Sequence, residues 1–297
     1  MRSSEKLLPT MTNMPKKKTA IYKKIPNEWT PTDRSIYTFT KDFFEQQEYN
    51  WWNMTHKWYM DTNRPYKAKI KEDCRILEIG SFEGSAAVWF IEECVRNYNC
   101  ELHMIDRWLP FNKYEDRVPD RVEGQMIDAE SRYDENIAIA CEAHLTKKQA
   151  KEKIFKWKGD STKMLYEMTK SYGERSFDII YIDGSHDQDQ VMIDAIMAYK
   201  LLDYGGFICF DDYQLNSGNI TLGGSIRTTV DQWYQNHREM LVPMYKLSHH
   251  DVGKHATGGP IDHNVRGRTR YLDASQAWFR KYKHIPSKAR KKIKNYE

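Results

Sequence analysis

The sequence lacks the features that would assign it to a membrane, secreted or disulfide-stabilised class of protein. No apolar run approaches the roughly 20 residues that a membrane-spanning helix needs, and residues 1–18 lack the apolar core of a secretory signal peptide. The five cysteines are odd in number and show no Cys-x-x-Cys spacing, which argues against a disulfide framework or a thiolate zinc site. These absences favour a soluble, cytoplasmic protein in a reducing compartment.

The charge is distributed unevenly. Residues 1–24 carry seven Lys or Arg and one Glu, and residues 280–297 carry eight and one. Because these ends contribute +6 and +7 to a net charge of only +4, the body between them is acidic, at about −9. Basic ends are able to hold nucleic acid. The acidic body offers no basic groove to extend them, so we expect them to act as solubilising ends and keep nucleic acid as an alternative.

The length of 297 residues and a hydrophobic content of 40% allow a substantial core. We expect a basic, partly disordered leader at 1–32 and an aromatic-rich helical extension at 33–73, which includes Trp51, Trp52 and Trp58. One domain at 74–273 follows, and then a basic tail at 274–297 that is helical or frayed. No internal repeat is visible.

Within this domain, short apolar runs alternate with segments of helical periodicity. The expected strands are 75–80, 101–106, 154–160, 177–183, 204–212, 241–247 and 269–272, and the expected helices are 85–95, 136–150, 162–172, 191–202 and 225–239. Gly205 stands where a helix C-terminal cap is expected. The polar interval 107–135 is a candidate lid, and 217–224 is a loop. This alternation predicts a mostly parallel α/β sheet with helices on both faces.

Two of the apolar runs end in carboxylates. Asp183 closes the first, and the pair Asp211 and Asp212 closes the second. Neighbouring parallel strands share one carboxyl edge, where ligands bind, so we expect the three aspartates to converge there. Oxygen ligands of this kind suit a hard divalent cation such as Mg²⁺. The alternative is that these aspartates cap the helices that follow each strand.

The turn after the first strand has the form Glu-x-Gly-x-x-x-Gly, from Glu78 through Gly80 to Gly84. Its glycines allow a ligand to approach the backbone closely, whereas the Gly-x-Gly-x-x-Gly pattern of nicotinamide-binding folds is absent. Asp106 closes the second strand and suits the hydroxyls of a ribose. Asp160 or Ser161, after the third strand, could hydrogen-bond an adenine.

In this order, the segments LEIGSFEGSAA, MIDRW, KGDS, FDIIYIDGSHD and GGFICFDDY resemble the motifs of class I S-adenosylmethionine-dependent methyltransferases. The resemblance covers residues 74–213. The IDGSHD and FDDY segments look like those of the metal-dependent small-molecule O-methyltransferases, particularly the branch that methylates sugar hydroxyls on natural products and glycans. The resemblance implies a Rossmann-like sheet of seven strands with a reversed last strand, to which the aromatic-rich sequence adds the expected N-terminal helical extension.

The resemblance also implies a role for each site residue. It assigns the methionine end of the cofactor to Glu78, Gly80, Ser81 and Gly84, the ribose to Asp106, the adenine to Asp160 and Ser161, and the cation to Asp183, Asp211 and Asp212. The general base lies three residues after the first metal-binding aspartate, which is the position of His186. A histidine needs little pKa adjustment to accept a hydroxyl proton near neutral pH. A purely structural histidine is the competing interpretation.

The expected function is therefore metal-assisted methylation of a hydroxyl, with a sugar or glycan as acceptor. Three alternatives stay open: an RNA or cap 2′-O-methyltransferase, a catechol-like or other small-molecule O-methyltransferase, and a degenerate fold that serves as a scaffold. The acceptor and the oligomeric state, including a homo-oligomer, are not readable from the sequence.

Overall fold

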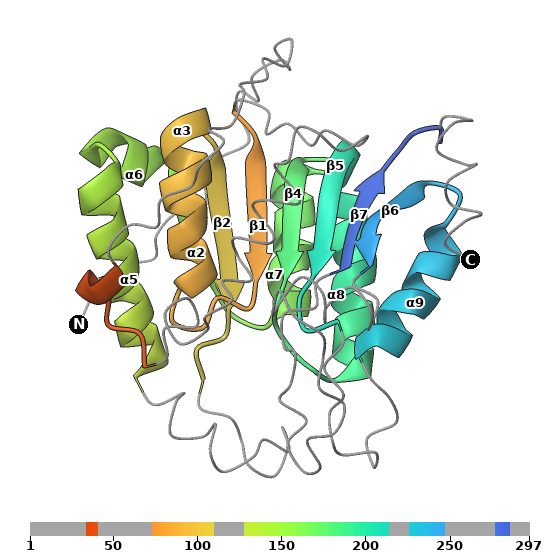
Figure 1. Cartoon of the computed structure of the whole chain (residues 1–297), viewed down its shortest axis with the longest axis horizontal. Coiled ribbons are helices and arrows are strands. Elements are labelled where there is room, and N and C mark those ends of the chain that lie inside the picture. The colour runs from red at the N-terminus through yellow and green to blue at the C-terminus, as the bar shows by residue number, and fades with distance from the viewer. Residues whose placement is uncertain (1–33, 41–72, 110–127, 214–225, 247–276, 286–297) are drawn as a thin grey trace, which may run out of the picture.

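The computed structural model describes residues 34–40, 73–109, 128–213, 226–246 and 277–285. Their strands form one seven-stranded sheet in the order β3-β2-β1-β4-β5-β7-β6 (Figure 1). The strands are β1 (Arg75–Ile79), β2 (Glu101–Asp106), β3 (Ile154–Lys158), β4 (Phe177–Ile182), β5 (Leu202–Phe210), β6 (Leu241–Lys246) and β7 (Ala277–Lys281). The first five run parallel, and β7 runs antiparallel to both of its neighbours. The predicted Rossmann-like sheet with a reversed strand is confirmed.

Helices cover both faces of this sheet. The helical segments are η1 (Arg34–Ile36), α2 (Ser85–Phe90), η2 (Ile91–Val95, a π-helical turn), α3 (Arg96–Tyr98), α5 (Ala129–His144), α6 (Lys147–Lys153), α7 (Ser161–Tyr172), α8 (Gln188–Leu201) and α9 (Ile226–His237). In Figure 1, α2 and α3 lie in front of the sheet and α7 and α8 lie behind it. Among the described residues, no helix is long and apolar enough to cross a membrane.

The two faces follow from the alternation of side chains along each strand. In β1, Ile76 packs into the cluster under α2 and α5, whereas its neighbour Leu77 packs into the cluster under α7 and α8. In β2, Leu102 and Ile105 divide between the same two clusters. All four side chains are at most 1% exposed. Strands buried on both faces read as continuous apolar runs, which is why the sequence located them.

Several helices begin at a capping side chain. Asp160 accepts a hydrogen bond from the Lys163 N–H at the start of α7, and Asp187 accepts from Gln190 at the start of α8. Thr146 and Gln149 form a capping box at the start of α6. Each cap satisfies a backbone N–H that has no partner inside the helix. Capping thus accounts for Asp160 and Asp187, and it leaves the aspartates after β4 and β5 for another role.

The prediction that residues 274–297 are helical or frayed is wrong where the structure describes them. Residues 277–281 form β7, which lies between β5 and β6, so the sheet extends beyond residue 273. Ala277 and Phe279 pack on the α7–α8 side, and Trp278 packs on the opposite side. A five-residue run that itself ends in Arg280 and Lys281 carried too little apolar periodicity to reveal a strand. The expected strand at 269–272 lies outside the described residues.

The predicted cap at Gly205 is also wrong. Helix α8 ends at Leu201, and the chain passes directly into β5, which contains Gly205 at φ +84°. The pairing of β5 with β4 shifts register here, because Phe177 pairs with Leu202 and Ile179 pairs with Phe207. The extra residues bulge out of the ladder, and a glycine adopts the left-handed backbone that the bulge needs.

The helix expected at 136–150 is in fact two helices, α5 and α6, and the first begins at Ala129. The end of the interval expected as a loop at 107–135 is therefore helical, while 110–127 lies outside the described residues. The leader at 1–32, the loop at 217–224 and the tryptophans of the N-terminal extension also lie outside them. Of that extension, residues 34–40 are described, and they contain only the short turn η1.

His103 in β2 is a buried titratable group away from the carboxyl edge of the sheet. Its side chain is fully buried, stacks on Phe155 with 4.5 Å between ring centroids, and accepts a hydrogen bond at Nδ1 from Trp157 Nε1 at 3.2 Å. Burial lowers the pKa of His103 from 6.5 to about 4, against the opposing effect of the nearby Glu101 carboxylate.

This shift predicts a loss of stability in mild acid. Between pH 6.5 and 4 the unfolded chain binds a proton at His103 and the folded chain does not. The free energy of unfolding should therefore fall by about 3 kcal/mol as pH decreases through this window. In His103→Asn, which keeps an acceptor for Trp157 and cannot titrate, urea denaturation should show a flatter dependence on pH. Equal pH slopes for both proteins would contradict the assignment.

Candidate active site

The site lies at the edge where the parallel strands β1, β2, β4 and β5 end, and its two halves touch through the backbone. Gly80 follows β1 at φ +89°, and a Cβ atom added there would lie 2.1 Å from the carbonyl oxygen of Asp183, which follows β4. The Asp183 N–H also donates to the Ile79 carbonyl at 2.8 Å. Only glycine permits this approach, so the turn after β1 lies directly against the end of β4.

Glu78, the fourth residue of β1, is a fully buried carboxylate. Its Oε2 accepts a hydrogen bond from Ser81 Oγ at 2.8 Å, and its Oε1 has no partner among the described residues. Burial raises the pKa of Glu78 to about 8; the Ser81 hydrogen bond opposes this shift and the Asp106 charge adds to it. A buried acceptor without a donor indicates a place where a ligand completes the hydrogen bonding.

Asp106, at the end of β2, connects two loops through hydrogen bonds. Its Oδ2 accepts from the Phe82 N–H and its Oδ1 from the Trp108 N–H, both at 2.8 Å. Trp108 Nε1 donates in turn to the Phe82 carbonyl at 2.7 Å. Phe82 and Trp108 have left-handed backbones, at φ +46° and +44°. Such conformations are costly for these residues and persist where surrounding contacts enforce them.

The two residues expected to contact adenine have partners of their own. Asp160 caps α7, and Ser161 Oγ accepts from Gln190 Nε2 of α8 at 3.0 Å. The same Gln190 also donates to Asp194 at 3.0 Å. Burial raises the pKa of Asp194 to about 6, although hydrogen bonds from Ser161 and Gln190 oppose the shift. The sequence analysis missed Asp194, because a single Asp in a helix gives no sign of burial.

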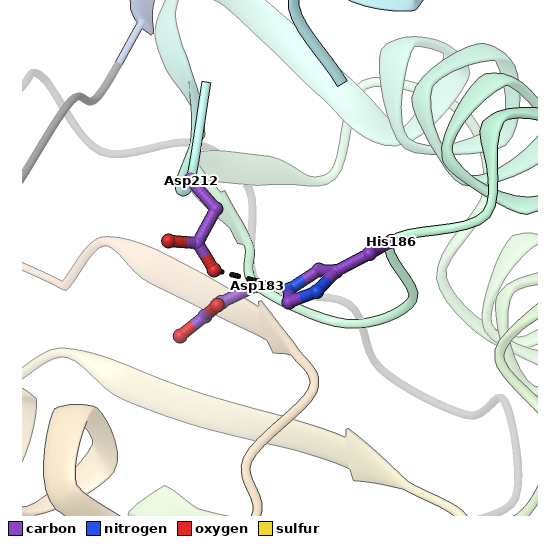
Figure 2. Close-up of side chains that lie close together, drawn as sticks. All are labelled: Asp183, His186 and Asp212. Atoms are coloured by element: carbon purple, nitrogen blue, oxygen red, sulfur yellow. Dashed lines mark ion pairs between the residues drawn. The ribbon is translucent and has the colours of Figure 1, made fainter. Parts of the chain in front are cut away.

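On the other half of the edge, Asp183, His186 and Asp212 converge (Figure 2). One ligand atom from each lies within 4.8 Å of the other two, and His186 Nε2 is 3.0 Å from Asp212 Oδ2. Asp183 comes from the end of β4, His186 from the loop before α8, and Asp212 from the end of β5. The His186 and Asp212 side chains are 48% and 25% exposed, so ligands can reach them.

Asp211 lines the same pocket but is not one of the three residues whose ligand atoms converge. Its side chain is buried, and its Oδ2 accepts a hydrogen bond from the Tyr181 hydroxyl at 2.6 Å. The same hydroxyl lies 3.4 Å from Asp183 Oδ2. Asp211 and Asp212 both follow the end of β5 at Phe210, and Asp212 has a left-handed backbone at φ +51°. The role of Asp211 as a direct cation ligand therefore stays a prediction, while Tyr181 emerges as a supporting residue that the sequence analysis missed.

The carboxylates of this half repel one another. Burial raises the pKa of Asp183 well above its ordinary value, and the charges of Asp211, Asp212 and Glu78 add to the effect. Burial lowers the pKa of His186, but the ion pair with Asp212 and the charge of Asp211 outweigh it and raise the pKa overall. A concentration of negative charge with one imidazole is a donor set that fits a divalent cation. Asp183, His186, Asp211 and Asp212 line one pocket. Its other lining residues are Ile182, Gly184, Ser185, Val191, Phe210 and Ile226.

A comparison with known protein families matches part of this chain to one type of domain. A family model described as "Methyltransferase domain" matches residues 77–213, from β1 to just beyond Asp212. Residues 77–213, just under half of the chain, are therefore similar to a methyltransferase domain. Every residue predicted for the site lies within this range, and the seven-stranded sheet has the reversed last strand that the sequence resemblance implied.

Individual relatives of the methyltransferase domain are distant. A segment of 37 residues is 49% identical to the uncharacterised protein R132 of Acanthamoeba polyphaga mimivirus, covering 12% of this chain and 17% of that protein. An O-methyltransferase from Bacillus cereus, solved in complex with SAH, is 16% identical over 58% of this chain and 66% of that chain, with a TM-score of 0.39.

A third relative is the O-methyltransferase TomG from Streptomyces achromogenes, which is involved in tomaymycin synthesis and was solved with SAM. It is 16% identical over 70% of this chain and 73% of that chain, with a TM-score of 0.44. At these scores the likenesses add nothing to the assignment. The similarity to a methyltransferase domain rests on the family model that matches residues 77–213.

The contact between Gly80 and Asp183 predicts that one methyl group added at Gly80 strongly lowers the stability of the protein. Gly80→Ala should lower the free energy of unfolding by more than 3 kcal/mol, because the new Cβ meets a backbone carbonyl that cannot move aside. Gly173→Ala is the matched control, since Gly173 also has a positive φ of +77° but nothing within 4 Å of an added Cβ. It should cost about 1–3 kcal/mol from the backbone alone. Equal losses in urea denaturation would contradict a steric role for Gly80.

Proposed function

We propose that this protein is an S-adenosylmethionine-dependent O-methyltransferase that uses a divalent cation and methylates a sugar hydroxyl. The observation that carries the proposal is the convergence of Asp183, His186 and Asp212 at the carboxyl edge of a methyltransferase sheet. The Gly80 turn of the same sheet lies against Asp183, so a donor held at that turn would present its methyl group beside the cation and base residues.

The residues after β1 fit the methionine end of the donor. Glu78 Oε1 is a buried acceptor without a partner among the described residues, which suits the ammonium group of an amino acid. Ser81 holds the other oxygen of Glu78, so the carboxylate has a fixed orientation. Gly80 and Gly84 have positive φ angles and expose the backbone of the turn. When bound, S-adenosylmethionine supplies an electrophilic methyl group on a sulfonium.

Asp106 fits the ribose of the same donor. Each of its carboxylate oxygens accepts one backbone hydrogen bond and retains a lone pair for a hydroxyl. The two backbone donors fix the carboxylate before any ligand binds, which lowers the cost of ordering it. Asp160 and Ser161, at the start of α7, follow the adjacent strand β3 and would contact the adenine.

Asp183 and Asp212 would hold the cation, and the neighbouring Asp211 would contribute negative charge. Their mutual repulsion is relieved by a positive ion, and oxygen donors favour Mg²⁺ or Mn²⁺. When bound, the ion lowers the pKa of the acceptor hydroxyl and orients it. Tyr181 keeps Asp211 in place through its 2.6 Å hydrogen bond.

His186 takes the proton from the acceptor hydroxyl. With Nε2 paired to Asp212, Nδ1 is the ring nitrogen that remains to accept it. Asp212 stabilises the imidazolium that forms, by the same ion pair that raises the pKa of His186. Loss of the proton frees an oxygen lone pair, which would form the new O–CH₃ bond as the S–CH₃ bond of the donor breaks and its electron pair returns to sulfur, leaving S-adenosylhomocysteine.

The acceptor class is inferred from the base. In the branch of methyltransferases that the IDGSHD segment resembles, the residue three positions beyond the metal aspartate is a histidine in enzymes that methylate sugars and a lysine in others. His186 occupies that position and faces the pocket that begins at Asp183. We therefore assign the acceptor to the sugars and glycans, with an RNA ribose or a catechol as the alternatives that an acceptor panel would reveal.

Replacement of the base should separate binding from turnover. His186→Gln should bind S-adenosylhomocysteine with unchanged affinity in calorimetry and lose about 10²–10⁴-fold in kcat, because only the proton acceptor is removed. His284→Gln, which changes an exposed histidine after β7, should match the wild type in both. Retention of turnover by His186→Gln would rule out its role as base.

Removal of the cation should stop the reaction. Transfer of labelled methyl from S-adenosylmethionine to sugar, catechol and capped-RNA acceptors would be followed with and without excess EDTA. We expect methylation of a sugar acceptor, its loss in EDTA and its return with added Mg²⁺ or Mn²⁺. Full activity in EDTA would remove the cation from the proposal. Methylation of the catechol or RNA alone would overturn the assignment of the acceptor.

A further inference from the structure

Glu83 is a buried carboxylate inside the turn between Gly80 and Gly84, at a position that the glycine pattern leaves variable. It is 2% exposed, although it lies outside the set of residues expected to touch the donor. A charged side chain of this kind is buried only where its hydrogen bonds and its charge are satisfied. Its partners therefore show what the turn is attached to.

The Glu83 carboxylate binds two separate parts of the chain. Oε2 accepts from the Thr40 N–H, and Oε1 accepts from Thr40 Oγ1 and from Arg132 Nε, all at 2.7 Å. Thr40 belongs to the short described segment before β1, and Arg132 belongs to α5. Hydrogen bonds to a charged group are stronger than neutral ones, so these contacts hold the turn firmly between the two elements.

The backbone of Glu83 joins the same network. Its carbonyl accepts from Asn136 Nδ2 of α5 at 2.9 Å, and Asn136 Oδ1 accepts from the Thr38 N–H at 2.7 Å. Asn136 is fully buried. Residues 38–40 and α5 thus hold Glu83 in place by hydrogen bonds that involve both its side chain and its main chain.

This hydrogen-bond network lies one residue from Phe82, which contacts the proposed ribose-binding residue Asp106. Phe82 precedes Glu83, holds Asp106 through its N–H, and has a left-handed backbone at φ +46°. A phenylalanine does not favour this conformation by itself, so neighbouring contacts have to maintain it. The hydrogen bonds of Glu83 hold the backbone that directly follows Phe82.

We propose that Glu83 is a positioning residue for the methyl donor: by anchoring the turn to Thr40 and Arg132, it holds Phe82 and Asp106 in the arrangement that binds the ribose. The inference rests on the proposed function, because it requires that the turn binds S-adenosylmethionine. It also gives residues 38–40 a part in donor binding without direct contact to the donor.

The test measures the affinity for S-adenosylhomocysteine by calorimetry, and the KM for S-adenosylmethionine and kcat by initial rates. Glu83→Gln should weaken the binding of S-adenosylhomocysteine about tenfold, because the amide nitrogen cannot accept one of the three hydrogen bonds and the charge that pairs with Arg132 is removed. KM for the donor should rise by a similar factor, while kcat at saturating donor should change by less than about threefold.

Three variants in the segment before β1 complete the comparison. Thr40→Val removes the hydroxyl contact and should weaken S-adenosylhomocysteine about threefold to fivefold. Thr40→Ser keeps both contacts and should bind like the wild type. Tyr37→Phe is the matched control, since it removes the 2.9 Å hydrogen bond to Glu92, which lies away from the turn. It should lower the melting temperature and leave the dissociation constant unchanged.

The outcomes separate the inference from the proposed function. If the wild type binds S-adenosylhomocysteine while Glu83→Gln and Thr40→Val bind it equally well and only melt earlier, as Tyr37→Phe does, Glu83 is purely structural and the inference is wrong. If the wild type itself shows no binding at millimolar ligand, the proposed donor site falls and the inference falls with it. Should Glu83→Gln fail to fold, the Thr40→Val and Thr40→Ser pair decides.

Discussion

The approach of the Gly80 backbone to the Asp183 carbonyl fixes the geometry of everything else at the carboxyl edge of the sheet. β1 and β4 are adjacent parallel strands, and this contact leaves no space for a side chain between the turn after one and the end of the other. The half built on Glu78 and Asp106, where we propose that the donor binds, and the half built on Asp183 and His186 are therefore held together. Such fixed placement is what methyl transfer between two bound molecules requires.

Charge is the second organising feature of the edge. Glu78, Asp106, Asp183 and Asp212 gather where four neighbouring strands end. Burial raises the pKa of Glu78 and of Asp183, and the charges of neighbouring carboxylates add to both shifts. A protein tolerates this cost when positive ligands offset it. The sulfonium donor and the divalent cation that we propose for this site both carry such charge. In that proposal, the acidic edge favours both ligands on electrostatic grounds.

The sequence predicted the parts of this protein that depend on neighbouring residues. Buried parallel strands read as apolar runs, so β1, β2, β4 and the carboxylates that follow them were located, and so was His186. The parts that it missed depend on contacts between distant segments. Nothing local marks residues 277–281 as an inner strand, Gly205 as a bulge, Asp211 as a partner of Tyr181, or Glu83 as a partner of Thr40 and Arg132.

The reversed strand β7 has a consequence for how the chain assembles. β5, which delivers Asp212 to the site, has its second neighbour in β7, although β6 precedes β7 in the sequence. During synthesis β6 emerges first and has no place beside β5, so the exposed hydrogen-bonding edge of β5 waits until residues 277–281 leave the ribosome. Residues 277–281 thus complete the sheet around a site to which they contribute none of the described site residues.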